Sequence, residues 1–405
     1  MTRRTRTLLI ATLLVVAAAV PAVGAAATTA TGTVSNDVPS ATGHQPTALG
    51  GDAPVAQTGA TCEFPITVTD ATGTDVTIEE RPERVTTLNP SAAQTMWEIG
   101  GKDQVVGVTQ FALYLEGADS RTNVSASGFG VSVEKVVGTT PDLVLAPNAS
   151  SLETVQALRD AGVTVFHFSG STTIEDVREK TTLTGRLTGN CEGAAEANAW
   201  MNANVETARE ATADAEDRRT LYPLGGGYIA GSETFISAMI DTAGGANVAG
   251  ERDLTGYPQI NDEVVLELAP DYLVLTGYSS YLRGQEPYAS TPAVENNNTI
   301  RVNRNWMNQP APRSVVMGVR TLTEGFHPEA AAEADFQTRA EVVAAMGTET
   351  PTATESQSIT DTATETTPET RTTGAEETAA SGPGFGVALA VLAVLGSALL
   401  ARRER

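Results

Sequence analysis

The sequence predicts an α/β protein of two Rossmann-like lobes with parallel sheets, joined by one long helix. Strands alternate with helices along residues 62–190 and again along residues 219–346, which is typical of parallel sheets flanked by helices. Residues 194–217 contain neither Gly nor Pro and lie between the two alternating segments. A short unit also occurs twice, because Glu134 and Glu263 each stand seven residues before the proline that precedes a similar apolar strand. This repeat indicates two lobes of related build with a cleft between them, although two generic αβ units could resemble each other by chance.

The first lobe is predicted to begin at Cys62. Alternating apolar and polar residues on both sides of Thr72-Gly73 predict a β-hairpin. Ser91 is predicted to cap the first helix, which Gly100 and Gly101 end. In order, the predicted elements are hairpin strands 66–70 and 75–80, strand 84–90, helix 92–100, strand 105–109, a loop over 110–130, a short helix from 132, strand 142–147, helix 151–162, strand 163–168 and helix 173–187.

The helix between the lobes is amphipathic. Small or apolar side chains recur every three or four residues, and acidic side chains keep another side in water. At 1.5 Å per residue, a helix over 194–217 extends about 36 Å, roughly the height of a small domain. We therefore expect residues 191–218 to form a helix that links the lobes; a surface helix of one larger domain is the alternative. The predicted stripe is Ala197, Met201, Val205, Ala208, Thr212 and Ala215.

The second lobe repeats the pattern of the first. In order, the predicted elements are strand 221–227, helix 233–245, a short helix at Glu263, strand 272–278 and strand 299–303. Gly225, Gly227 and Ala230 also fit a dinucleotide-binding fingerprint after a strand. The helix that follows begins only at residue 232 or 233, so no phosphate would lie on its first turn as that fold requires, and we set dinucleotide binding aside.

The composition limits the class of ligand and the environment. The chain has 405 residues, 41% of them hydrophobic, which is enough for two or three domains with real cores. Its net charge of −23 argues against binding nucleic acid or an anionic membrane through the bulk surface. An acidic surface with little lysine is also typical of a protein that stays soluble in concentrated salt, where self-repulsion is screened.

The amino-terminal residues indicate export. Three arginines precede an apolar run over 8–20 and a small-residue segment, so residues 1–27 are predicted to be a signal peptide. Residues 28–61 are predicted to be a disordered leader. In an exported protein the two cysteines, Cys62 and Cys191, predict a disulfide, and two free thiols are the alternative.

The carboxy-terminal residues indicate surface anchoring. Residues 347–380, dominated by Thr and Glu, predict an unfolded stalk, and residues 381–405 predict a membrane-anchoring tail. This tail, with Pro383-Gly384-Phe385, resembles the PGF-type sorting signal of archaeal surface proteins. The resemblance implies that an archaeosortase replaces the apolar helix with a lipid, on the outer face of the membrane. Three sequons permit glycosylation there: Asn123, Asn148 and Asn297.

The sequence nominates no metal ligand and no catalytic residue. His44 lies in the leader, and His167 and His327 have no nearby Cys or His partner. His167 stands on an apolar strand and is predicted to be a hydrogen-bonded core histidine. No nucleophile elbow, zinc-protease motif or P-loop is present.

Five segments between about residues 84 and 324 resemble the helical-backbone class of ABC-importer substrate-binding proteins. They are RVTTLNPSAAQTMWEIGGKDQVVGVT, VEKVVGTTPDLVLAPN, AGSETFISAMIDTAGGANV, GYPQINDEVVLELAPDYLVLTG and NRNWMNQPAPR. The resemblance implies a monomer that captures a solute and delivers it to an ABC permease dimer with its cytoplasmic ATPase. It implies neither catalysis nor a resident cofactor.

Within this class the sequence is most similar to the cobalamin-binding branch. A corrin ring is a large, partly apolar disc with amide arms, which aromatic walls and a few polar groups suit. Gly128 and Tyr257 stand where that branch tends to have Trp, and Pro147-Asn148 replaces another frequently aromatic position. The residues that the resemblance assigns to the ligand are Tyr114, Phe129 after Gly128, Tyr257, Asn305, Trp306 and Arg313.

Two alternatives stay open for the function. A ferric siderophore or haem carrier would need an Arg or Tyr cluster, which Tyr278, Tyr281 and Arg283 could supply. A two-lobed α/β enzyme would need titratable residues that converge in the cleft, and the sequence names none.

Glu134 and Glu263 match the two surface acids, one on each lobe, that dock onto permease arginines in the resembled class. Two carboxylates at a fixed separation can set register and encounter rate on two basic pockets. Their alternative role is that of solvated acids at helix starts, where the helix dipole favours them.

Overall fold

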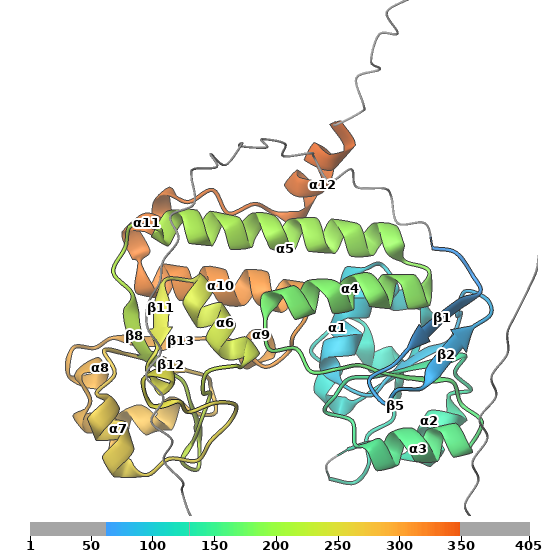
Figure 1. Cartoon of the computed structure of the whole chain (residues 1–405), viewed down its shortest axis with the longest axis horizontal. Helices are drawn as coiled ribbons and strands as arrows, with labels where there is room; N and C mark the ends of the chain where they lie inside the picture. Colours follow the sequence, from blue (N-terminus) through green and yellow to red (C-terminus); the bar gives the residue numbers. More distant parts are fainter. Residues whose placement is uncertain (1–61, 129, 349–405) are drawn as a thin grey trace, which may run out of the picture. The chain divides into compact units, whose positions relative to one another are not determined.

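The computed structural model describes residues 62–128 and 130–348 (Figure 1). The predicted signal peptide, leader and anchoring tail, nearly all of the predicted stalk, and Phe129 lie outside the described residues.

The first lobe is built on a five-stranded parallel sheet with strand order β5-β4-β3-β6-β7. The interior strand β6, between β3 and β7, is buried along its whole length, which explains its unbroken apolar sequence. The antiparallel hairpin β1-β2 is formed as predicted. The strands are β1 Ile66–Thr69, β2 Asp75–Ile78, β3 Val85–Thr87, β4 Val105–Val108, β5 Thr122–Asn123, β6 Leu143–Ala146 and β7 Val165–His167.

The helices of the first lobe begin at defined caps. Asn89 caps α1, because its side chain accepts a hydrogen bond from the Ser91 amide, so the prediction that Ser91 is the cap was wrong. Pro90 is favoured at the first position of a helix, so α1 starts at residue 90 rather than at the predicted residue 92. Ser132 caps α2, and Thr173 forms a capping box at the start of α4. The helices are α1 Pro90–Glu98, α2 Val133–Gly138, α3 Leu152–Asp160 and α4 Ile174–Thr188.

The second lobe contains a four-stranded parallel sheet with strand order β11-β8-β12-β13. Strand β11 was not predicted, since its three residues, Gly-Ala-Asn, carry no β-branched side chain. The predicted strand 221–227 was misplaced, because the sheet strand β8 ends at Leu221. Residues 223–225 instead begin a small hairpin, in which Gly225, Gly226 and Gly227 have positive φ and turn the chain back. The strands are β8 Arg218–Leu221, β9 Pro223–Gly225, β10 Tyr228–Ile229, β11 Gly245–Asn247, β12 Tyr272–Leu275 and β13 Thr299–Arg301.

The second lobe also contains helices that the sequence reasoning missed. The most important is α10, which packs along α5 (Figure 1). Helices α11 and α12 follow it and also contact α5. The helices are α6 Phe235–Thr242, α7 Asp262–Leu268, α8 Pro292–Glu295, α9 Arg304–Met307, α10 Pro312–Phe326, α11 Pro328–Glu333 and α12 Arg339–Thr348.

The predicted linking helix is α5, Cys191–Thr212. Its early turns place Ala194 and Ala197 in the core of the first lobe, and its later turns place Met201, Val205 and Ala208 in the core of the second. One straight element therefore contributes to both cores.

Helix α5 ends before Asp217, contrary to the prediction. The amide of Ala213 donates to the Glu210 carbonyl, which tightens the last turn, and Ala215 is exposed. Several acidic side chains follow Thr212, where the negative end of the helix dipole disfavours them.

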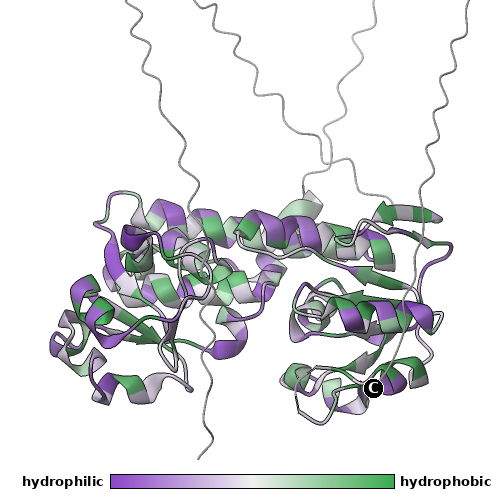
Figure 2. Cartoon of the chain, turned by 60° about the horizontal axis from the view of Figure 1, so that its bottom comes forward, coloured by the Kyte–Doolittle hydropathy of each residue, from purple (hydrophilic) through white to green (hydrophobic). Residues whose placement is uncertain are grey.

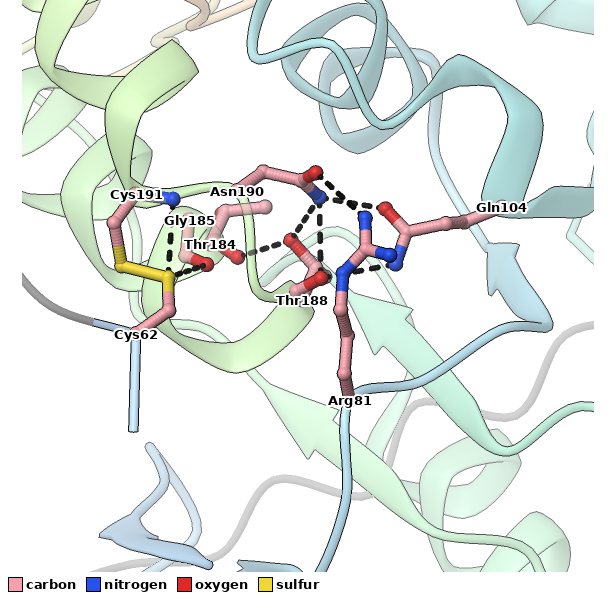
Figure 3. Close-up of a disulfide and its surroundings, with 8 residues drawn as sticks. All are labelled: Cys62, Arg81, Gln104, Thr184, Gly185, Thr188, Asn190 and Cys191. Carbon is pink, nitrogen blue, oxygen red and sulfur yellow. Dashed lines mark hydrogen bonds between the residues drawn. A yellow bond between two sulfur atoms is a disulfide. The ribbon is translucent and has the colours of Figure 1, made fainter. Parts of the chain in front are cut away.

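The start of α5 is fixed to the first lobe. Cys191 forms the predicted disulfide with Cys62 (Figure 3). Nearby, Asn190 donates to the side chain of Gln104 at 2.6 Å. Gly193 allows α5 to lie against the end of α1, since a Cβ atom there would be 2.1 Å from the Ile99 carbonyl oxygen.

Hydrophobic segments gather on the strands of both lobes, and the helices carry mixed faces (Figure 2). None of the helices within residues 62–348, position 129 aside, is long and apolar enough to cross a bilayer.

Candidate functional site

Residues of both lobes line a cavity of about 410 Å³. The first lobe contributes loops that follow the carboxyl ends of its parallel strands, where open α/β sheets bind ligands. The second lobe contributes the start of α6, the loop before α7 and the residues after α9. The lining residues are Asn89, Ser91, Pro147, Asn148, Ala149, Gly170, Ser171, Thr172, Glu233, Thr234, Phe235, Gly256, Tyr257, Met307, Asn308 and Pro310.

Three helices begin at this cavity. Asn89 and Thr234, the caps of α1 and α6, both line it, and so does Thr172, next to the cap of α4. The amino-terminal ends of helices carry partial positive charge, so this wall favours acceptor groups on a ligand. The hydroxyl of Ser171 is buried there, without a hydrogen-bond partner among the described residues. It is therefore an unsatisfied polar group in a residue that lines the cavity.

Glu233 is the residue of this wall with an unusual backbone. Its φ of 58° lies in the left-handed region, which a non-glycine residue rarely adopts. Strained backbone of this kind clusters at ligand sites, where the surrounding structure holds it in place. Its exposed side chain adds a negative charge to the rim of the cavity.

The face of α1 toward the second lobe is polar. Ser91, Gln94 and Glu98 are all buried and follow one another at spacings of three and four residues, which places them on one side of the helix. Ser91 lines the cavity, and the other two make contacts beyond it. The contact between the lobes is therefore hydrogen-bonded rather than purely apolar.

A chain of hydrogen bonds runs from Tyr114 to Asn305 across the lobes. The Tyr114 hydroxyl donates to Gln94 Oε1 at 2.5 Å, and Gln94 Nε2 donates to Ser314 Oγ at 2.9 Å. Ser314 Oγ in turn donates to the carbonyl oxygen of Asn305 at 3.2 Å. Burial, and next the carboxylate of Glu98, raise the pKa of Tyr114, so its hydroxyl stays protonated and donates.

Glu98 connects three elements by ion pairs. Its carboxylate accepts from Arg313 Nε of α10 at 2.6 Å and lies 3.6 Å from Arg339 Nη1 of α12. Arg339 also pairs with Glu196 of α5 at 3.0 Å. The guanidinium of Arg313, predicted to contact the ligand, is therefore engaged in holding the lobes together.

The structure does not bring all the predicted ligand residues to the cavity. Tyr257 lines the cavity and is 55% exposed, so its ring is available to a ligand. Tyr114, Asn305 and Arg313 meet at the contact between the lobes and do not line the cavity. Trp306 is half-buried in α9, whose next residue lines the cavity in its place. Phe129 is not among the described residues.

The sequence reasoning missed Gln94, Ser314 and Ser171. A signal existed for Gln94, because it stands with Ser91 and Glu98 on one side of a predicted helix. Such spacing is equally typical of a solvent-exposed face, so it did not indicate a lobe contact. Ser171 carries no signal in the sequence, since its role depends on burial at a cavity that residues far apart in the chain create.

The residues of the siderophore alternative do not converge on this cavity. Arg283 donates to the side chain of Asn297 and lines a different surface pocket. The guanidinium of Arg304 stacks 4.1 Å from the ring centre of Tyr278. Tyr278, Tyr281 and Arg283 do not line the cavity between the lobes.

The dinucleotide fingerprint is not realised either. Its glycines belong to the β9-β10 hairpin, and α6 begins only at Phe235. Glu251, the acidic residue that follows these glycines, pairs with Arg219. Within residues 62–128 and 130–348, no group of three His, Cys, Asp or Glu side chains could hold a metal ion.

Glu134 and Glu263 occupy equivalent places in the two lobes. Each is exposed and lies in the first turn of a short helix, α2 or α7. Each follows its helix cap, Ser132 or Asn261, by two residues. The repeated unit of the sequence is thus the same helix, turn and strand in both lobes.

Comparisons with known proteins agree with this architecture. Residues 85–305 match the family described as periplasmic binding protein. A cobalamin-binding protein of Halobacterium salinarum (strain ATCC 29341 / DSM 671 / R1) is 44% identical over 355 residues, covering 84% of this chain and 89% of the relative. An uncharacterized ABC transporter substrate-binding lipoprotein of Bacillus subtilis (strain 168) is 28% identical over 277 residues, covering 66% of this chain and 87% of the relative.

A solved structure confirms the fold. The periplasmic heme-binding protein of Roseiflexus sp. RS-1, in its apo form, aligns with a TM-score of 0.55 at 22% identity, covering 60% of this chain and 98% of that structure. Residues 382–404 match the PGF-CTERM motif, which confirms the predicted sorting signal and indicates anchoring at an archaeal cell surface.

Proposed function

The chain belongs to the periplasmic binding protein family, and we propose that it captures a corrinoid, cobalamin, outside the membrane and delivers it to an ABC importer. The observation that carries the proposal is the 44% identity, over 84% of this chain, to a protein described as cobalamin-binding. The cavity between the lobes is the proposed place of capture.

The lining of the cavity suits a solute with both apolar and polar surface. Tyr257 offers an exposed aromatic ring, and Phe235 and Met307 add apolar wall. The free hydroxyl of Ser171 and the amide of Asn148 supply polar contacts for amide arms. A few placed polar groups in a mainly apolar wall are typical of small-molecule sites.

The size of the cavity constrains how the solute lies. A volume of about 410 Å³ is at the lower end of the range for small-molecule pockets. A corrinoid is larger, so it would extend over the rim or separate the lobes when it binds. We expect the separation to be modest, because α5 contributes side chains to both cores and cannot bend easily.

Delivery without chemistry is the proposed mechanism. The solute enters the cleft, is held by non-covalent contacts, and leaves unchanged at an ABC permease dimer that a cytoplasmic ATPase drives. Glu134 and Glu263 would dock on basic pockets of the permease, because each carboxylate is exposed at the same place of its lobe.

Isothermal titration tests the choice of solute. The protein is titrated with cyanocobalamin, a ferric siderophore and haemin under the same conditions. We expect saturable binding of one cyanocobalamin per chain and no saturable binding of the two iron compounds. Tighter binding of either iron compound would contradict the proposal and identify that compound as the solute. Chromatography of the recovered solute checks that it is unchanged, and a converted product would contradict capture without chemistry.

A further inference from the structure

The first lobe contains a second cavity, of about 270 Å³. It lies between the β1-β2 hairpin, the end of β7 and one side of α4, and it shares no lining residue with the cavity between the lobes. Its lining residues are Thr69, Asp70, Ala71, Phe166, His167, Phe168, Ser169, Asp176, Glu179, Lys180 and Leu183.

His167 presents an unpaired ring nitrogen at this cavity. The residue is only 6% exposed, and its Nδ1 atom has no hydrogen-bond partner among the described residues. Its backbone is fixed, because its amide donates to Asp70 at 3.0 Å and its carbonyl accepts from Ala71 at 2.9 Å. The prediction of a hydrogen-bonded core histidine was thus wrong for this ring nitrogen. A buried ring nitrogen without a partner is unfavourable and indicates a missing group.

Lys180 presents an unpaired ammonium group at the same cavity. Its Nζ atom is buried and has no partner among the described residues, although an ammonium group carries three donors. Burial lowers the pKa of Lys180 to about 8, against the opposing charge of Asp176. At neutral pH the group therefore remains mostly protonated and able to donate.

The neighbouring carboxylates are already engaged. Asp70 pairs with Arg159 and accepts from Thr72 and His167. Asp176 accepts from the amides of the α4 capping box. Within the described residues neither of these two acids forms an ion pair with Lys180, so its ammonium group keeps unsatisfied donors beside the cavity.

We propose that this cavity binds a small monovalent anion, which accepts hydrogen bonds from Lys180 Nζ and from His167 Nδ1. Lys180 Nζ supplies donors, and His167 adds one in the tautomer that carries its proton on Nδ1, so the two side chains match an acceptor. A single full positive charge at Lys180 balances one negative charge. The carboxylate of Glu179 at the exposed edge disfavours a dianion by repulsion. Phe166, Phe168 and Leu183 give an apolar wall that fits a short carbon chain. Chloride and short-chain carboxylates share this chemistry.

The charges that face the site determine its pH dependence. Affinity should fall as the pH rises through about 8, because Lys180 then loses the proton that it donates. The titratable and charged groups around the cavity are Asp70, Arg159, His167, Asp176, Glu179 and Lys180.

Anion titrations of the whole chain test the proposal. The thermal unfolding midpoint is followed against chloride, acetate, butyrate and sulfate at constant ionic strength, and chloride-35 line broadening reports direct binding and its competition by carboxylate. We expect saturable stabilisation by a monovalent anion, and a stronger effect of butyrate than of chloride if the natural anion is a carboxylate. A stronger stabilisation by chloride than by butyrate would identify the natural anion as a halide. If none of these anions gives saturable stabilisation, the cavity holds water only and the proposal is overturned. Preferential binding of sulfate also overturns it.

Three variants localise the binding. Lys180→Met keeps the length of the side chain and removes its charge, and we expect at least a tenfold loss of affinity. His167→Phe keeps the aromatic volume and removes the ring nitrogens, and provides a second measurement if the first variant folds poorly. Lys135→Met is the matched control, because the Lys135 ammonium already donates to the Ser125 carbonyl at 2.7 Å on another helix. Unchanged affinity in both site variants, or an equal loss in the control, overturns the assignment.

Discussion

Arg313 donates to the buried carboxylate of Glu98 at 2.6 Å and so joins α10 of the second lobe to α1 of the first. Glu98 is 3% exposed and also faces Arg339, whereas Arg313 is half-exposed. A buried carboxylate is tolerated when cations and hydrogen bonds compensate its desolvation. The two arginines supply this compensation, so the Glu98 carboxylate contributes both to the contact of the lobes and to the position of α12.

Replacing Glu98 by Gln should destabilise the protein by about 1–3 kcal/mol, because the charge-assisted hydrogen bonds from Arg313 and the ion pair with Arg339 are lost. The loss stays below that of a fully buried pair, because Arg313 is partly in water. Urea unfolding measures the change. Glu175→Gln removes an exposed pair with Arg178 and should cost less than about 0.5 kcal/mol. Equal effects of the two substitutions would show that burial of Glu98 is unimportant.

Removing the Cys62–Cys191 disulfide should lower stability by about 4–5 kcal/mol in the chain-entropy account, because the bond closes a loop of 129 residues. The double substitution to Ala and chemical reduction should produce the same decrease in unfolding free energy. A reductant should leave the double variant unaffected, which serves as the control. A decrease below about 1 kcal/mol would contradict the loop-closure explanation.

Asp70 should contribute acid-dependent stability. Burial alone would raise its pKa, but hydrogen bonds from Thr72, His167 and Thr74 outweigh burial and lower the pKa to about 2. Since the folded pKa lies below the unfolded one, this stability is complete above about pH 4 and is lost as the pH falls toward 2.

The Asp70→Asn variant tests this dependence. It should be about 2 kcal/mol less stable at neutral pH and should change less with pH between 4 and 2. The comparison is urea unfolding at several pH values. Asp103→Asn, at a fully exposed side chain, should keep the pH dependence of the parent. A parent-like acid profile in Asp70→Asn would refute the assignment.

Tyr257→Ala should weaken binding of the solute by about 10- to 100-fold, because an exposed aromatic wall of the cavity is lost. Tyr278→Ala is the control, since that ring stacks with Arg304 and does not line the cavity. Titration calorimetry with cyanocobalamin compares the two. If only Tyr278→Ala weakens binding, the ligand site lies near Tyr278, Tyr281 and Arg283, the residues of the siderophore or haem alternative.

Charge reversal at the two exposed acids separates capture from delivery. Glu134→Lys and Glu263→Lys should each reduce uptake in cells that carry the importer, and the double variant should reduce it further, because like charges then face the basic permease pockets. Solute affinity of the purified variants should stay unchanged. Glu153→Lys, in the first turn of α3, provides the control for an added charge at a helix start.

Much of the fold was available from the sequence alone. Buried strands such as β6 give unbroken apolar runs, and α5 gives a stripe at helical spacing. The repeated units at Glu134 and Glu263 predicted two related lobes, and two cysteines in an exported chain predicted their bond. These features are set by local periodicity or by residue type, so each can be detected without knowing its neighbours in space.

The tertiary structure decided the remainder. Strand β11 exists because it pairs with β8, and the roles of Gln94 and Glu98 exist because α10 packs against α1. The contacts of Arg313, and the unpaired groups at His167 and Lys180, depend on side chains far away in the chain. Periodicity specifies which face of an element is buried, but only packing specifies which atoms that face meets. The element pattern was therefore predictable, whereas the chemistry of both cavities was not.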